Sequence, residues 1–135
     1  IAVIHLTNLF INQYKSTCRI KIIHVSSGAA HNAVPSWATY CVSKAAIEMH
    51  AAVLQKESDV VGENIQVYAI APGVVDTDMQ AEIRSSNEES FSSKSKFVEL
   101  KKNGELIDST TTAATLIDLM ENQTLPGSYT LRDYY

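Results

Sequence analysis

Residues 65–73 have the sequence IQVYAIAPG, and this stretch decides the predicted fold. Its first seven residues are mostly apolar and include three β-branched side chains, which predicts a strand buried on both faces, as in a parallel sheet. Pro72 cannot extend a hydrogen-bonded ladder and Gly73 permits a sharp turn, so this strand ends in a loop. Residues 20–25 (IKIIHV) repeat the pattern and are followed by a second loop at residues 26–28.

Helices are predicted around these strands, at residues 1–15, 39–58 and 110–121. The 39–58 segment is the richest in helix formers, because Ala, Lys, Glu, Met and Leu dominate it, and Thr39 is placed to cap its start. The first helix carries apolar side chains three or four residues apart, which lie on one face of it: Val3, Leu6, Phe10 and Tyr14.

Residues 76–106 are polar and rich in Ser, Lys and Glu, which predicts a mobile excursion with weak helical spacing at 79–83 and 97–100. Because the excursion follows the loop at 72–73, we favour a substrate lid over a merely flexible loop. With a short last strand at residues 128–131, the order is helix, strand, helix, strand, excursion, helix, strand. This alternation is typical of parallel strands joined by right-handed crossover helices, so the predicted class is α/β.

The composition excludes some partners. The chain of 135 residues has a net charge of −4 and a pI near 5.5, whereas nucleic acids and anionic membranes require clusters of Lys and Arg. No apolar run approaches the roughly 18 residues that span a bilayer, so we expect no membrane partner. Cys18 and Cys41 lack the framework of a secreted disulfide domain, which favours reduced thiols and a cytoplasmic protein. The chain opens at Ile1 inside a periodic pattern, which predicts that an upstream part is absent.

Three side chains are candidates for catalysis. Ligands of open α/β sheets bind beyond the carboxyl ends of the strands, where Ser27 follows the 20–25 strand. Tyr40 and Lys44 lie four residues apart on the 39–58 helix, so their phenol and ammonium share one face. An ammonium about 5 Å away would stabilise the phenolate by on the order of 3 kcal/mol and lower the tyrosine pKa from about 10 towards about 8.

A phenol of that pKa can exchange a proton with a carbonyl oxygen, which the hydroxyl of Ser27 would hold as well. A Tyr and a Lys four residues apart also occur by chance on helix surfaces. The Ser27 hydroxyl, at the end of a strand, is the third group, and its presence favours a catalytic site over a chance pair on the protein surface.

The motifs around these residues resemble the short-chain dehydrogenase/reductase family over essentially the whole chain. They are residues 25–28 (VSSG), 40–46 (YCVSKAA) and 71–77 (APGVVDT), in that family's order and spacing. Four further stretches resemble its sepiapterin reductase and benzil reductase branch: residues 37–41 (WATYC), 76–80 (DTDMQ), 97–101 (FVELK) and 104–106 (GEL).

The resemblance implies that residues 1–135 are the C-terminal part of a single doubly wound, Rossmann-type domain whose N-terminal dinucleotide-binding half is absent. It implies a reductase that transfers a hydride from NADPH to a small carbonyl, such as a ketone, a diketone or a pterin side chain. Ser27 would orient the carbonyl, Tyr40 would donate the proton, and Lys44 would lower the tyrosine pKa and hold the nicotinamide ribose. The family also implies a homodimer formed through the 39–58 helix.

Further residues are assigned to the cofactor and the substrate. By resemblance, the nicotinamide pocket is formed with Tyr40 and Lys44 by four residues: Pro72, Gly73, Val75 and Thr77. The substrate pocket is predicted to include Gly28, Trp37 and Met79, with ordinary core packing as the alternative for the two large side chains. The four histidines, at positions 5, 24, 31 and 50, lack the spacing of metal ligands, so we expect no metal.

Two departures from the family keep alternatives open. The five glycines form no phosphate-binding turn of the form G-x-x-x-G-x-G, and the family's catalytic asparagine would fall just upstream of Ile1. The chain is therefore also interpreted as an inactive fragment or a non-catalytic binding protein of the same fold. A third interpretation is an alcohol dehydrogenase of the family that uses NAD(H).

Overall fold

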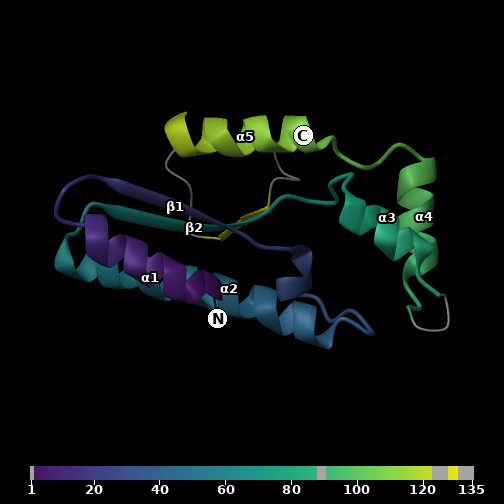
Figure 1. Ribbon diagram of the computed structural model, residues 1–135, viewed down its shortest axis with the longest axis horizontal. Helices are drawn as coiled ribbons and strands as arrows, with labels where there is room; N and C mark the ends of the chain where they lie inside the picture. Colours follow the sequence, from purple (N-terminus) through teal and green to yellow (C-terminus); the bar gives the residue numbers. More distant parts are fainter. Residues whose placement is uncertain (1, 88–90, 123–127, 131–135) are drawn as a thin grey trace.

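The computed structural model describes residues 2–87, 91–122 and 128–130. Its centre is a parallel sheet of three described strands, β1 (Ile20–Val25), β2 (Ile65–Ala71) and β3 (Ser128–Thr130), with β2 in the middle. Helices α1 (Ala2–Tyr14) and α2 (Ala38–Val61) cover one face and α5 (Ser109–Asn122) covers the other (Figure 1). The predicted α/β class is confirmed, as part of a Rossmann-type domain. Residue 131, the end of the predicted last strand, lies outside the described residues.

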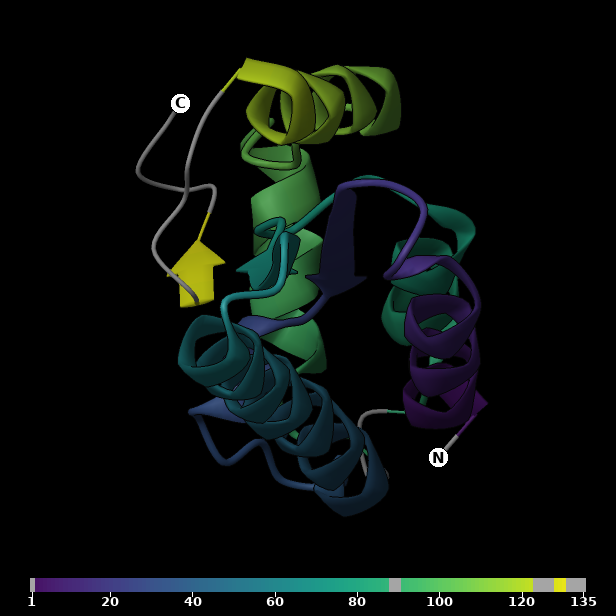
Figure 2. The same ribbon diagram turned by 90° about the vertical axis from the view of Figure 1, so that its left-hand side faces the viewer.

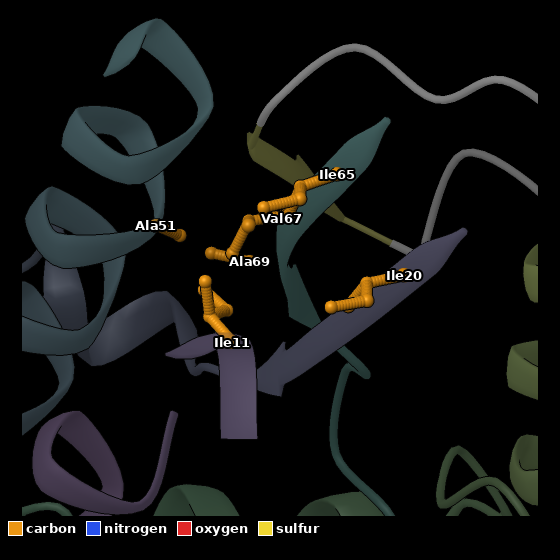
Figure 3. Close-up of a cluster of buried hydrophobic side chains, with 6 residues drawn as sticks. All are labelled: Ile11, Ile20, Ala51, Ile65, Val67 and Ala69. Atoms are coloured by element: carbon orange, nitrogen blue, oxygen red, sulfur yellow. The ribbon is translucent and has the colours of Figure 1, made fainter. Parts of the chain in front are cut away.

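β2 is buried on both faces, as its sequence predicts. Side chains of successive residues point to opposite faces of a strand, so Val67 packs towards α2 while Tyr68 and Ile70 pack against Leu119 of α5. Figure 3 shows the core cluster on the α2 side, which contains Ile11, Ile20, Ala51, Ile65, Val67 and Ala69. Because β1 runs parallel to β2, with Val25 opposite Ile70, both strands end at the same edge of the sheet.

The predicted apolar face of α1 faces solvent in the described structure. Thr7 and Ile11 are the buried residues of this helix. The four residues of the predicted face are between 43% and 64% exposed: Val3, Leu6, Phe10 and Tyr14. The reason is that α1 lies at the β1 edge of the sheet, where β1 is the outermost described strand and offers little surface to cover (Figure 2).

The bounds of α2 differ from the prediction at both ends. Thr39 is not the cap: the helix begins at Ala38, and the preceding Trp37 makes no side-chain capping hydrogen bond. The helix continues to Val61, three residues beyond the predicted end, where Gly62 adopts a left-handed φ of 69° and donates its N–H to the Ser58 oxygen. Glycine adopts this conformation without the steric cost that a Cβ brings, which fixes where the helix stops.

The helical spacing predicted at residues 79–83 and 97–100 is confirmed, and the mobility of the segment stays a prediction. The segment contains two helices, α3 (Asp78–Ser85) and α4 (Lys94–Lys102). Its ends are joined, because Ile107 accepts a hydrogen bond from the Asp76 N–H at 2.8 Å and donates one to the Val74 oxygen at 3.0 Å. We call residues 76–107 the α3–α4 segment. Figure 1 shows it projecting from one end of the sheet.

We call the place where residues 74–76 pair with residue 107 the neck of the α3–α4 segment. Two ion pairs connect the helices of this segment to Asp76 in the neck. The Asp76 carboxylate lies 2.5 Å from the ammonium of Lys101 on α4 and 3.8 Å from the guanidinium of Arg84 on α3. The position of these helices therefore depends on charged contacts at the neck as well as on their apolar side chains. Across the described ranges, no helix combines the length and the apolarity that a bilayer crossing requires.

Candidate active site

Ser27 stands at the turn that ends β1. The last ladder hydrogen bond of this strand runs from the Ser26 N–H to the Ile70 oxygen at 2.7 Å. The chain then enters a short 3₁₀ helix, η1 (Gly28–Ala30), and the Ser27 hydroxyl oxygen caps it by accepting the Ala29 N–H at 3.2 Å. Because the oxygen is the acceptor in this contact, the hydroxyl proton stays available for a further partner.

Lys44 connects Tyr40 with the end of β1. Both residues lie on the first turns of α2, and the Lys44 ammonium lies 5.6 Å from the centre of the Tyr40 ring. It donates a hydrogen bond of 2.8 Å to the backbone oxygen of Val25, two residues before Ser27. Desolvation in this half-buried place lowers the pKa of Lys44 from its ordinary value. The three predicted catalytic residues thus come from two adjoining segments, the end of β1 and the start of α2.

An aromatic cluster lies beside Tyr40. The Trp37 ring meets the Tyr40 ring edge to face, with centres 5.2 Å apart, and stacks on the Phe91 ring at 5.1 Å with planes inclined by 5°. Phe97 of α4 completes the cluster, 5.6 Å from Trp37. Phe91, which is only 4% exposed, is not among the site residues predicted from the sequence. The signal that could have indicated it is a single large apolar side chain within a Ser-rich stretch.

Two adjoining cavities open next to these rings. The first, of about 190 Å³, is lined by Trp37, Tyr40, Met79 and Ile83. The second, of about 290 Å³, shares Trp37 and Ile83 and is further lined by Ser36, Glu82, Ser86 and Phe91. Trp37 and Met79 therefore line a cavity beside Tyr40. Gly28 lies in the turn after Ser27, where an added Cβ would meet no atom within 4 Å.

The residues predicted to hold the nicotinamide follow the carboxyl end of β2. Ser27 follows the carboxyl end of β1, at the same end of the sheet. Gly73 has a left-handed φ of 82°, and Val75 forms the parallel bridge to Ile107 at the neck of the α3–α4 segment. Thr77 precedes α3, and its hydroxyl makes no capping hydrogen bond to that helix.

Two features of these residues are compatible with a bound nicotinamide ribose and its phosphates. The Thr77 hydroxyl makes no capping hydrogen bond to α3, so it is available to a phosphate oxygen near the start of this helix. Lys44 has three N–H donors, of which one is directed to Val25, so its ammonium can also hold ribose hydroxyls. Within the described ranges, no three His, Cys, Asp or Glu side chains gather as ligands for a metal ion.

A sequence profile of the family described as short chain dehydrogenase matches residues 1–88. The chain belongs to the short-chain dehydrogenase family. Among curated relatives, this short-chain dehydrogenase chain is 34% identical to a benzil reductase ((S)-benzoin forming) of Bacillus cereus, over 83% of this chain and 45% of the relative. It is 33% identical to the enzyme of the same name from Bacillus subtilis, over 96% of this chain and 54% of the relative. It is also 33% identical to the sepiapterin reductase of Meriones unguiculatus, over 76% and 37% of the respective chains.

Solved structures show the same family and fold. A short-chain dehydrogenase/reductase of Saccharomyces cerevisiae matches with a TM-score of 0.79 and 30% identity, over 95% of this chain and 51% of that one. The KRED1-Pglu enzyme matches with a TM-score of 0.75 and 29% identity, over 93% and 51%. The chain spans about half the length of the two benzil reductases that it matches. The predicted family membership and its likeness to benzil and sepiapterin reductases are confirmed.

Proposed function

We propose that this chain is the C-terminal part of a reductase that uses NADPH to reduce a small carbonyl, with Ser27, Tyr40 and Lys44 as its catalytic residues. The observation that carries the proposal is the 2.8 Å hydrogen bond by which Lys44, one turn from Tyr40, reaches the end of the strand that carries Ser27. Because its ammonium lies between the start of α2 and the end of β1, Lys44 is close both to the Tyr40 phenol and to the place where Ser27 would hold the substrate. The remainder of the domain would be encoded upstream of Ile1.

The residues of this chain would divide the work as follows. The Ser27 hydroxyl donates a hydrogen bond to the substrate oxygen and orients it, while the Tyr40 phenol passes its proton to the same oxygen. The Lys44 charge favours the phenolate that remains and holds the ribose of the nicotinamide. Bound NADPH supplies the hydride. Pro72, Gly73, Val75 and Thr77 would line the nicotinamide pocket, and the adenosine part would be held by upstream residues, since this chain has no glycine-rich phosphate turn.

The cavity beside Tyr40 supports a carbonyl attached to a bulky, flat group. Its walls are the Trp37 indole and the side chains of Met79 and Ile83, which offer apolar surface and an aromatic face. Benzil reductases and sepiapterin reductases among the relatives favour a diketone or a pterin side chain over a small aliphatic ketone. Measuring the turnover with NADPH and with NADH distinguishes this reductase from an NAD-dependent alcohol dehydrogenase of the family.

The test is steady-state NADPH oxidation by the full-length protein with an aromatic diketone. Tyr40→Phe should lower kcat by about 10²-fold or more, since it removes the proton donor and keeps the ring, and the Kd of NADPH should change little. Tyr14→Phe is the matched control, because it removes an exposed hydroxyl on α1, away from the cavity. Full activity of Tyr40→Phe would refute the proposal. Saturable, tight NADPH binding by the 135-residue chain alone would contradict the interpretation as an inactive fragment.

We also propose that the protein is a cytoplasmic homodimer formed through α2. This helix has a second apolar stripe that faces solvent, including Val42 and Met49, which are 69% and 66% exposed. Ala45, Ala46 and Ala52 share the exposed side, while Ala51 packs in the core. The exposed face of α1 supports a contact with a further surface as well. Both cysteines are free, as in a reducing compartment.

Sedimentation of the full-length protein tests the homodimer. Met49→Lys should shift the dimer to a monomer, because it places a charge in the contact. Ile117→Lys on α5, where the wild-type side chain is 55% exposed on the opposite face of the sheet, should leave the dimer intact. A dimer that survives Met49→Lys would contradict the proposed contact.

A further inference from the structure

Both carboxylate oxygens of Glu48 contact other side chains beside the candidate active site. It lies on α2, one turn after Lys44 and two turns after Tyr40, and its side chain is only 10% exposed. Oε1 accepts a hydrogen bond from the Ser26 hydroxyl at 2.5 Å, and Oε2 lies 2.5 Å from Nε2 of His31. A carboxylate that is this buried is costly unless hydrogen bonds compensate its lost hydration, and the Ser26 hydroxyl and the His31 ring are among the groups that do so here.

The partners of Glu48 bracket the turn that carries Ser27. Ser26 directly precedes Ser27 and is 3% exposed. His31 follows η1 as its C-terminal cap and donates its backbone N–H to the Gly28 oxygen at 3.3 Å. One carboxylate thus holds the residue before the Ser27 turn and the residue after it.

Lys44 and Glu48 contact Val25, the last residue of β1, and Ser26, which follows it. The Lys44 ammonium binds the Val25 oxygen, and the Glu48 carboxylate binds the Ser26 hydroxyl, so two successive turns of α2 hold the two residues before Ser27. Consecutive Cα atoms are 3.8 Å apart. A shift of Ser26 is therefore transmitted almost directly to the Ser27 hydroxyl. A displacement of about 1 Å at a reacting group can cost about 10²-fold in rate.

We propose that Glu48 is a positioning residue that holds the Ser27 hydroxyl where it meets the substrate oxygen, with His31 fixing the far end of the turn. The inference rests on the proposed function, because it presupposes that Ser27 orients the carbonyl. Glu48 acts on the reaction through Ser26 and the turn, so its loss changes the placement of Ser27.

A double-mutant cycle in the full-length protein tests this role, with kcat/KM for an aromatic diketone as the readout. Glu48→Ala should lower kcat/KM by about 10- to 100-fold, while the Kd of NADPH stays within about twofold. In a Ser27→Ala background the same substitution should have almost no further effect, because the hydroxyl that it places is already missing. Glu57→Ala, which removes an exposed carboxylate from the same helix, should leave kcat/KM unchanged.

Two milder variants keep the test valid if Glu48→Ala does not fold. Glu48→Gln retains an oxygen that accepts the Ser26 hydroxyl and should recover most of the activity. Ser26→Ala removes that contact alone and should lower kcat/KM in the same direction as Glu48→Ala. If Glu48→Ala, or Ser26→Ala in its place, lowers the activity equally with and without Ser27, the positioning role is overturned. If Ser27→Ala itself is fully active, the proposed function fails instead.

Discussion

The ammonium of Lys44 donates a 2.8 Å hydrogen bond to the backbone oxygen of Val25, two residues before Ser27. In the ladder, Val25 stands opposite Ile70, near the end of β2. Lys44 therefore lies at the point where both strands end and where Pro72 and Gly73 begin the next loop. One side chain thus contacts two parts of the site, the Tyr40 ring and the strand end that precedes Ser27.

Replacing Lys44 by Met should affect catalysis much more than folding. Val25 is 49% exposed, so water can replace the lost donor, and we expect a stability loss of at most about 1 kcal/mol. The kcat/KM should fall by about 10²-fold or more, because the charge that favours the phenolate is removed. Lys44→Arg keeps the charge but not the compact ammonium, and it should recover part of the activity. NADPH oxidation and urea unfolding measure the two effects, and unchanged turnover in Lys44→Met would exclude the role of its charge.

The left-handed end of α2 predicts a difference between two glycines. Gly62 has φ 69° and open space around an added Cβ, so Gly62→Ala should cost about 1 kcal/mol from backbone strain alone. At Gly28 the space is also open and φ is not left-handed, so Gly28→Ala should be within about 0.5 kcal/mol of the wild type. Urea midpoints at constant m-value measure both. Equal losses in the two variants would show that the left-handed conformation does not set the end of the helix.

The strands and the three candidate catalytic residues were predictable because their signals are local in the sequence. A strand such as β2, buried on both faces, has few alternatives to apolar side chains, and Pro72 with Gly73 marks its end. Tyr40 and Lys44 share a face because helix geometry alone puts residues four apart together. The position of Ser27 at the end of β1 follows from the length of the apolar run before it.

The remaining features depend on contacts between residues far apart in the sequence. Glu48 meets Ser26 and His31 from 22 and 17 positions away, and no local pattern indicates such a carboxylate. Phe91 stacks on Trp37 across 54 positions. The exposed face of α1 was also beyond prediction, because hydrophobic spacing shows that a face exists and not what covers it.

Phe91 should hold the α3–α4 segment against the cavity. Its buried ring stacks on Trp37, so Phe91→Ala should lower the stability of this segment by about 3 kcal/mol and raise KM for an aromatic substrate. Phe91→Leu keeps most of the apolar contact and should lose only about 1 kcal/mol, the contribution of ring stacking. Amide hydrogen exchange within residues 94–102 reports the change. Protection of α4 that does not differ among the three proteins would show that the stack does not hold the segment.

A pair of stacked histidines between β1 and α2 predicts how the stability responds to acid. The His24 and His50 rings lie 5.5 Å apart with planes inclined by 3°. His24 contacts Thr7 at 3.1 Å and the Ile47 oxygen at 3.4 Å, and His50 contacts Asn8 at 3.3 Å. Among the described residues, Nδ1 of His50 has no hydrogen-bond partner although it is buried. If Nδ1 of His50 were protonated, its N–H would therefore have no hydrogen-bond acceptor among the described residues.

Desolvation by burial lowers the pKa of both histidines below the ordinary 6.5, more than the Ile47 oxygen raises that of His24. For His50 the charge of His24 lowers the pKa further, and Glu57 opposes both. The unfolded chain thus binds more protons than the folded one just below pH 6.5, and the free energy of unfolding must fall as the pH drops through this value. It levels off again below the folded-state pKa values.

His50→Gln, which keeps a donor towards Asn8, should weaken the loss of stability between about pH 7 and pH 5, because one of the two depressed groups no longer titrates. Glu57→Gln should have the opposite effect, since it removes the charge that raises the pKa of His50. Urea unfolding of the full-length protein and the two variants at several pH values gives the slopes. A wild-type slope that both variants leave unchanged, or stability that rises on acidification through this range, would mean that the histidine pair does not control the acid response.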